Sequence, residues 1–408
     1  MKEAVDRPGE VALPEFESTS QVPEGVRPPP GNPRFPLFDG LRAMAAISIL
    51  VLHSSYATLY TNTGLLGRWM ANLDIGVAIF FVISGFLLYR PFVEARFEGK
   101  RGPHTLRFYQ RRVLRIVPAY WFALTVLAVF GLSRATPTST LDHWPKYYFF
   151  LQNYTTSFEG IGPAWSLCVE MSFYLVLPLY AWLLFRLLSR SSLRRQVTVE
   201  AVILVVLSLV SLPFWRAFAN GESLLFHQWL PHYFYWFAIG MGLAILSAWS
   251  VRTGAAANRL FTALGRHPGA MWLAALALFV VLGFITVPAL DFFTDTPGTA
   301  WAKWLLQPLI ALLVVAPAVF SRPGVGIPGR LLAWAPVAWL GLISYGIFLW
   351  HLAVQFVLLD NGWIGGPDPA ARTVVSVILV LAFTVPIAAF SYYVIERPFL
   401  RLKERGRV

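Results

Sequence analysis

Long apolar runs dominate the chain from about residue 41 onward, and short polar segments separate them. A helix needs roughly 20 apolar residues to cross the hydrocarbon core of a bilayer. By that criterion the sequence predicts about ten membrane-spanning helices, at residues 41–60, 75–90, 114–133, 165–188, 200–218, 230–249, 269–289, 301–320, 337–359 and 373–395. The gaps leave no room for a soluble domain. The expected fold class is therefore an all-α integral membrane protein with one helical bundle.

The basic residues alternate with these runs in a way that predicts orientation. Most of the 33 Lys and Arg residues fall in every second connecting segment and in the two ends of the chain. Because cytoplasmic loops carry the excess of Lys and Arg, this alternation favours an even number of spans. We expect a multi-pass cell-membrane protein with both termini in the cytoplasm.

The two ends of the chain have a different composition from the apolar region. Residues 1–36 are rich in Pro and Glu and lack an apolar stretch of signal-peptide length, so we expect a disordered cytoplasmic tail and no cleavable signal. The membrane domain is expected at residues 37–400, with a second cytoplasmic tail at 401–408. Pro398, directly after Glu396 and Arg397, is expected to end the last helix.

Composition narrows the possible chemistry. Hydrophobic residues make up 57% of the chain and charged residues 13%, with a net charge of +12. Because topology accounts for this basic excess, nucleic acid is not an expected partner. The single cysteine, Cys168, excludes an intrachain disulfide. The sequence lacks a His-Glu-x-x-His zinc motif, a Walker loop and a Gly-x-Gly-x-x-Gly motif, so we expect neither a metal nor a permanently bound cofactor.

Ionisable residues inside a membrane are costly and are therefore candidates for function. Arg42 lies at the start of the first span, and His53 lies three helical turns further on. That spacing puts both residues within about 20° of one helix face, with His53 about 16 Å deeper. His53 is thus a candidate for a reactive group near mid-membrane. The alternative is a histidine that packs against a neighbouring carbonyl.

Arg112 and Arg115, at the start of the third span, are three residues apart and share a face. Arginine pairs bind phosphate oxygens with bidentate geometry, so this pair would suit a phosphorylated cytosolic donor. The alternative is that the pair only sets the topology.

Glu170 lies inside the fourth span, after Trp165 and Ser166. A carboxylate at this depth needs a partner, and His53 is one possibility. A structural bond between helices is the alternative. In the second span, which follows Asp74, Ser84 and Gly85 favour close helix packing over a nucleophile, because there is no Gly-x-Ser-x-Gly elbow.

The ninth span carries Ser344, Tyr345 and His351. Ser344 and His351 are seven residues apart and so lie on one helix face. His351 is a second-tier candidate for the reactive group.

Taken in order, these stretches resemble the acyltransferase family 3 membrane proteins. The matching pieces are Phe38-Asp39-Gly40-Leu41-Arg42-Ala43 with His53, Phe80-Phe81-Val82-Ile83-Ser84-Gly85-Phe86, Arg112-x-x-Arg115, Trp165-Ser166-Leu167-x-x-Glu170 with Phe173-Tyr174, and Ser344-Tyr345 with His351. Each piece alone is weak, but the set follows the family's order over most of residues 35–400 and is specific as a whole.

The resemblance implies transfer of an acyl group, most simply acetyl, from cytosolic acyl-CoA to a hydroxyl of an envelope glycan, glycolipid or secondary metabolite. Acyl-CoA would be a co-substrate. Acyl transfer to a hydroxyl needs a general base, and the resemblance gives that role to His53, with Glu170 orienting it. The resemblance also implies that the donor is bound by Arg42, Arg112 and Arg115. Residues with a supporting role in the site would be Asp74, Trp165, Ser166, Ser344, Tyr345 and His351. Transfer through an acyl-His53 intermediate is an open alternative.

Other functions compete with this interpretation. A transporter of a small polar or charged solute is the main alternative, because bundles with buried His, Glu and Arg also move ions and solutes. A non-catalytic scaffold or lipid-binding protein is the third. Binding of coenzyme A separates the enzyme from both. A sugar hydroxyl on a cell-wall glycolipid or polysaccharide is the favoured acceptor, and a macrolide-type metabolite is the alternative.

Overall fold

The computed structural model describes residues 35–132, 143–154, 160–219, 228–253, 265, 267–286, 296–321 and 326–405. All the regular secondary structure in these residues is helical, which confirms the predicted fold class. Nine of the helices described are long and apolar enough to cross a membrane. The bent pair α15–α16 makes a tenth if it forms one span. The chain is therefore a multi-pass membrane protein.

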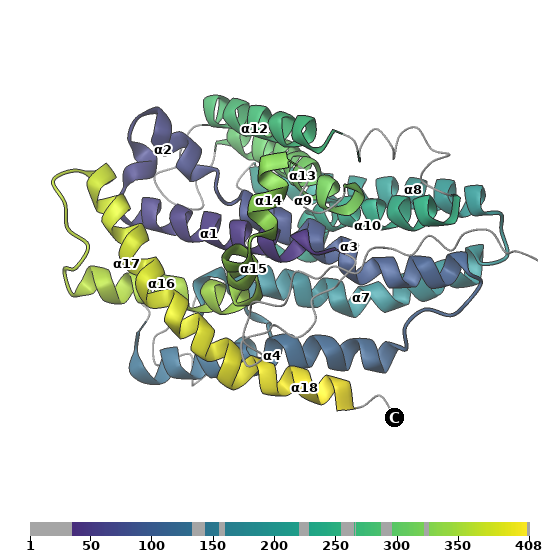
Figure 1. The fold of residues 1–408 in the computed structure, drawn as a ribbon, viewed down its shortest axis with the longest axis horizontal. Helices are drawn as coiled ribbons and strands as arrows, with labels where there is room; N and C mark the ends of the chain where they lie inside the picture. The colour runs from purple at the N-terminus through teal and green to yellow at the C-terminus, as the bar shows by residue number, and fades with distance from the viewer. Residues whose placement is uncertain are drawn as a thin grey trace, which may run out of the picture.

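The long helices run roughly along one direction (Figure 1). The first half of the chain forms α1 (Leu37–Ala57), α2 (Gly64–Ala71), α3 (Ile75–Phe97), α4 (Thr105–Phe130), α6 (Trp144–Tyr148), α7 (Trp165–Leu188), α8 (Leu193–Leu209) and α9 (Ser211–Ala219). The second half forms α10 (Leu230–Thr253), α12 (Pro268–Ile285), α13 (Pro297–Phe320), α14 (Gly326–Ala333), α15 (Ala335–Leu342), α16 (Ser344–Asp360), α17 (Pro369–Phe390) and α18 (Arg397–Arg405). Short 3₁₀ turns occur at Tyr60–Asn62, Gln152–Tyr154 and Gly162–Ala164, and a π-helical segment, η6, covers Ser391–Glu396.

Helix α3 lies in the centre and packs tightly against α10. A Cβ atom added at Gly85 would lie 2.3 Å from the backbone oxygen of Phe237, and one at Gly240 would lie 2.1 Å from that of Val82. Each glycine therefore permits a close approach that no other residue would allow. This contact confirms the prediction that the Ser84-Gly85 region serves close helix packing.

Helix α3 extends to Phe97, past the end expected at residue 90, so Arg90 and Arg96 both lie within the helix. Both side chains are buried. Arg90 pairs with Glu94 at 2.7 Å and donates to Ser247 Oγ at 3.0 Å, and Arg96 pairs with Glu200 of α8. Because these partners compensate the guanidinium charges, the helix continues where a count of apolar residues stops.

The expected ninth span, residues 337–359, is broken. Helices α15 and α16 meet at Ile343 with a bend of 72°. Helix α15 packs against α1, and α16 packs against α1 and α17. The break places Ser344, the first residue of α16, at a buried position inside the bundle.

The last helical segment continues through Pro398, so the prediction that this proline ends it was wrong. Figure 1 shows α17 and α18 in yellow as one diagonal rod. The π-helical segment η6 joins them. Pro398 lies in the first turn of α18, where its missing N–H costs little, and the wider π-helical turn before it relieves the steric conflict.

The expected tail at residues 1–36 lies outside the described residues except for its last two. One of these, Phe35, is buried and forms edge contacts with Phe38 and Phe86. At the other end, α18 reaches Arg405, beyond the boundary expected at residue 400.

Candidate active site

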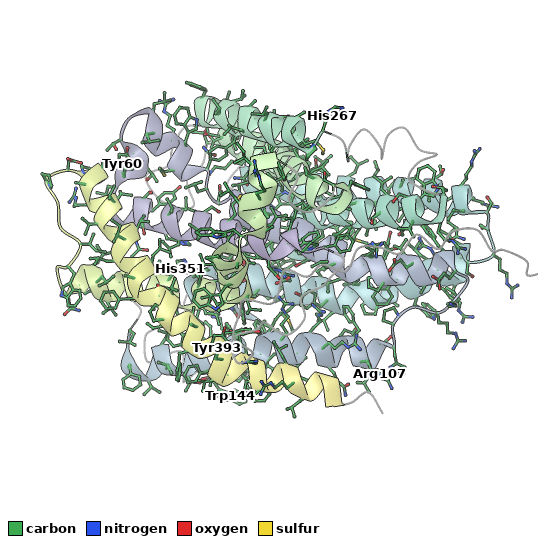
Figure 2. All side chains as sticks on the ribbon, viewed as in Figure 1. Tyr60, Arg107, Trp144, His267, His351 and Tyr393 are labelled. Carbon is green, nitrogen blue, oxygen red and sulfur yellow. The ribbon has the colours of Figure 1, made fainter. Side chains whose placement is uncertain are left out.

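Two histidines from distant parts of the sequence meet inside the bundle. His53 Nδ1 on α1 lies 2.9 Å from His351 Nε2 on α16. The ring centroids are 5.0 Å apart, and the ring planes are inclined by 33°. Figure 2 labels His351 within the helical bundle. The structure thus joins the first-choice and the second-choice candidate of the sequence into one pair.

One hydrogen bond to a backbone oxygen fixes the His351 ring, and another joins α16 to α1. His351 Nδ1 lies 2.9 Å from the carbonyl oxygen of Ile347, one turn earlier in α16. Gln355 Nε2, one turn later, donates to the backbone oxygen of His53 at 2.9 Å. His351 is 1% exposed, whereas His53 is only partly buried. His53 is therefore the more exposed member of the pair.

Three arginines form a basic cluster at the end of α1 that begins with Leu37. Arg42 lies close enough to Arg112 and Arg115 of α4 for their charges to repel. Arg42 Nη1 also bonds to Asp39 Oδ1 at 2.8 Å, which offsets part of that repulsion. Arg112 is partly buried and Arg115 is exposed. The guanidinium groups of these three neighbouring arginines supply N–H donors that can bind an anion such as a phosphate.

Glu170 lies beside different partners from the one expected. Ser84 Oγ of α3 donates to its carboxylate, Tyr174 also hydrogen-bonds to it, and Arg112 interacts with it electrostatically. The expected partner, His53, instead places its Nδ1 against His351. The physical reason is helix rotation, because Glu170 faces α3 and α4 while His53 faces α16. Glu170 thus belongs with the arginines rather than with the histidine pair.

Tyr345 and Glu396 extend the same polar region. Tyr345 Oη donates to the backbone oxygen of Ile116 at 2.9 Å, next to Arg115. The buried carboxyl of Glu396, in the π-helical segment, interacts with Arg115 and Tyr345. The sequence analysis treated Glu396 as a helix-end signal and missed this position. Only the fold could reveal it, because nothing in the local pattern links residue 396 to residue 115.

For three supporting candidates, the contacts described lie outside the histidine pair and the arginine cluster. Asp74 accepts a hydrogen bond from Gln307 at 2.6 Å and lies 3.6 Å from Lys303 Nζ. Ser166 donates to the carbonyl of Pro163, and the Trp165 ring packs against Tyr233. The remaining candidate, Ser344, is buried at the start of α16.

One apolar cavity in the described residues lies outside this site. A cavity of about 210 Å³ lies between α7, α8 and α10, and its lining includes Phe173, Leu207 and Phe234. None of the predicted site residues lines it. Within the part of the chain that the structure describes, no three His, Cys, Asp or Glu residues come together as metal ligands.

The histidine pair and the arginine cluster are connected by α1. His53 and Arg42 lie three turns apart on this helix, which corresponds to about 16 Å along its axis. The site therefore combines a partly exposed imidazole with a distant group that can bind an anion. Such an arrangement suits a substrate whose reactive atom is separated from its phosphates by a long arm.

Known proteins share this sequence pattern. The profile of the acyltransferase domain family matches residues 36–393. "Putative peptidoglycan O-acetyltransferase YrhL" of Bacillus subtilis is 27% identical over 379 residues, which cover 89% of this chain and 54% of that protein. The peptidoglycan O-acetyltransferase OatA of Listeria monocytogenes is 24% identical over 383 residues, which cover 89% of this chain and 55% of that protein. The chain thus spans about half the length of these relatives. No solved structure matches it significantly.

Proposed function

This chain belongs to the acyltransferase domain family, and on that premise we propose that it is a membrane O-acyltransferase that uses cytosolic acyl-CoA, most simply acetyl-CoA. The acceptor is a hydroxyl of an envelope glycan. The observation that carries the proposal is the histidine pair, with His53 partly exposed, three turns along α1 from a cluster of arginines. The names of the two relatives, both peptidoglycan O-acetyltransferases, support the choice of acceptor class and of acetyl.

In this proposal the arginines bind the donor. Arg42, Arg112 and Arg115 contact the phosphates of coenzyme A, and the pantetheine arm carries the thioester along α1 toward His53. Charge-assisted contacts between guanidinium and phosphate are stronger than neutral hydrogen bonds, so they can hold a flexible donor at this depth. Glu170 keeps Arg112 in place and offsets part of its positive charge.

His53 removes the proton from the acceptor hydroxyl in the reaction itself. The hydroxyl oxygen attacks the thioester carbonyl, the carbon–sulfur bond breaks, and the thiolate of coenzyme A leaves. The proton held by His53 then passes to that thiolate, which restores the neutral ring. A route through an acyl-His53 intermediate needs the same unprotonated ring nitrogen.

The proposed orientation in the membrane follows from the cytosolic location of the acyl-CoA donor. Both termini are cytoplasmic, so the arginine cluster faces the cytosol and the acceptor reaches His53 from the other side. Cysteine labelling tests this placement, with Cys168 replaced by Ser. Single cysteines in the loop after α3, at residues 98–104, should resist impermeant reagents applied from outside, while cysteines at residues 361–367 should react. Labelling of residues 98–104 from outside would reverse the orientation.

The direct test is mass spectrometry of envelope glycans from cells that express this protein, the His53→Gln variant or neither. Acetyl esters should appear only with the unchanged protein, and radiolabel from acetyl-CoA should enter the same glycan in inside-out membrane vesicles. Equal ester content in all three cell types would reject the glycan acceptor. Label entering a small secreted metabolite instead would identify the alternative acceptor class.

A further inference from the structure

The two histidines differ in their surroundings, although their rings touch. Both ring nitrogens of His351 have defined partners, namely the carbonyl of Ile347 and the ring of His53. His351 is also almost completely buried, at 1% exposure. His53 is partly exposed, and only its Nδ1 faces His351. One ring can therefore meet a substrate, and the other lies behind it.

The hydrogen bonds define the tautomers of both neutral rings. A backbone carbonyl can only accept, so His351 Nδ1 must carry the hydrogen that it donates to Ile347. Its Nε2 then carries the lone pair. Two nitrogens 2.9 Å apart need one hydrogen between them, so His53 Nδ1 must donate to this lone pair. The lone pair of His53 is consequently on Nε2.

We propose that His351 is a positioning residue for the proposed acyl transfer: it holds His53 in the tautomer whose Nε2 lone pair accepts the proton of the acceptor hydroxyl. The inference rests on the proposed function, because it assigns His53 Nε2 as the reacting atom. It replaces the expected role of Glu170 as the partner that orients His53.

A neutral partner suits this position in the bundle. When His53 Nε2 takes a proton, the ring becomes an imidazolium, and its Nδ1–H keeps its bond to the His351 lone pair. That bond strengthens as the positive charge develops. A carboxylate in the same place would stabilise the imidazolium more, but it would be charged before the reaction and therefore costly in the apolar interior.

His351 is a poor candidate for the base itself. Its Nδ1 already bonds to a carbonyl, and its only lone pair is bonded to His53. A substrate hydroxyl would have to displace the His53 ring to reach it. The burial of His351 and its two bonds fit a group that acts through its neighbour.

Three variants of the full-length protein test the proposal in inside-out membrane vesicles, with radiolabelled acetyl-CoA as donor and the endogenous glycan as acceptor. His351→Leu keeps apolar volume but removes the acceptor for His53 Nδ1–H, so kcat should fall about 10- to 100-fold while KM for acetyl-CoA stays unchanged. His351→Gln restores an acceptor oxygen within reach and should recover most of kcat. Gln355→Leu is the matched control, because it removes a bond between the same two helices without touching the rings, and it should keep kcat within a factor of about 3.

Nitrogen-15 spectra of histidine-labelled protein in lipid nanodiscs give an independent readout, with the His53 signals identified by their loss in His53→Gln. His53 should show hydrogen on Nδ1 in the unchanged protein and in His351→Gln, and a mixture of tautomers in His351→Leu. Equal rates for His351→Leu and His351→Gln, hydrogen on His53 Nε2 in the unchanged protein, or an equal loss in Gln355→Leu would each overturn the positioning role. Full activity of well-folded His53→Gln would instead reject His53 as the base of the proposed function.

Discussion

Two buried polar clusters in this bundle look alike in sequence and differ in structure. One is the histidine pair, His53 and His351. The other, the α3–α8 cluster, consists of Tyr89 and Arg96 of α3 with Gln196 and Glu200 of α8. Each cluster joins residues of two helices that are far apart in the sequence. Each also places ionisable groups inside the membrane-spanning bundle, where such groups are costly.

The side chains of the α3–α8 cluster bond to one another. Arg96 pairs with Glu200, donates to Gln196 Oε1 at 3.2 Å and contacts Tyr89 Oη at 3.2 Å, while Tyr89 donates to Glu200. Arg96 is 3% exposed and Glu200 is 0% exposed. The histidine pair, by contrast, has one partly exposed ring. The two clusters therefore differ in that one ring of the histidine pair is partly exposed, whereas the charged groups of the α3–α8 cluster are buried.

The largest expected effect is a loss of activity when the histidine pair is changed. His53→Gln should lower acyl transfer about 10²- to 10⁴-fold, because the general base is lost while Gln can still hydrogen-bond to His351. The melting temperature and the amount of protein in the membrane should change little. Transfer rates at equal protein levels check this, with Gln355→Leu as a variant of the same helix contact. Near-normal turnover would place His53 with the structural residues.

The second prediction is that a change in the α3–α8 cluster lowers stability and leaves activity unchanged. Glu200→Gln leaves Arg96 buried without a countercharge and should reduce stability by about 3–5 kcal/mol, whereas turnover per folded molecule should stay normal. Thermal unfolding in detergent and rates at matched folded concentration measure the two quantities. The double variant Arg96→Met/Glu200→Leu should recover much of the lost stability. A loss of turnover in a stable double variant would mean that this cluster takes part in the reaction.

The third prediction concerns the donor. Arg112→Ala and Arg115→Ala should each weaken acetyl-CoA binding by about 1.5–3 kcal/mol, which corresponds to a rise in KM of roughly 10- to 150-fold. S-acetyl-pantetheine, which lacks the nucleotide phosphates, should be used equally well by both variants and the unchanged protein. Arg111→Ala, an exposed neighbour, is the matched control and should leave KM unchanged. An unchanged KM in the first two variants would return these arginines to a role in topology.

The smallest expected effect concerns Glu170. Glu170→Gln keeps an oxygen to accept from Ser84 but removes the negative charge beside Arg112. Because the hydrogen bonds survive, the loss should be about 1 kcal/mol, or roughly fivefold in activity. The defect should appear in KM for acetyl-CoA, since Glu170 belongs with the arginines. A loss in kcat as large as that of His53→Gln would restore Glu170 as the partner of the base.

The sequence identified the candidate residues better than it identified which of them contact each other. The pair Arg42 and His53 was found from helix periodicity alone, because both lie on one continuous helix. The structure brings Arg42, Arg112 and Arg115 together, as their predicted shared role requires. The catalytic and donor-binding roles stay predictions until the variants are measured. Ser84 and Glu396 were not expected in the site, because each contacts it across a helix interface that no local pattern encodes.

By itself the sequence determined that this protein crosses the membrane many times as a bundle of helices. That result is local, since a run of about 20 apolar residues must satisfy its backbone hydrogen bonds within one helix. Only the tertiary structure decided that His53 meets His351 rather than Glu170, and that the ninth span breaks at Ile343. Those outcomes depend on how distant helices rotate and pack against each other. Side chains on one helix carry no information about which neighbouring face will meet them.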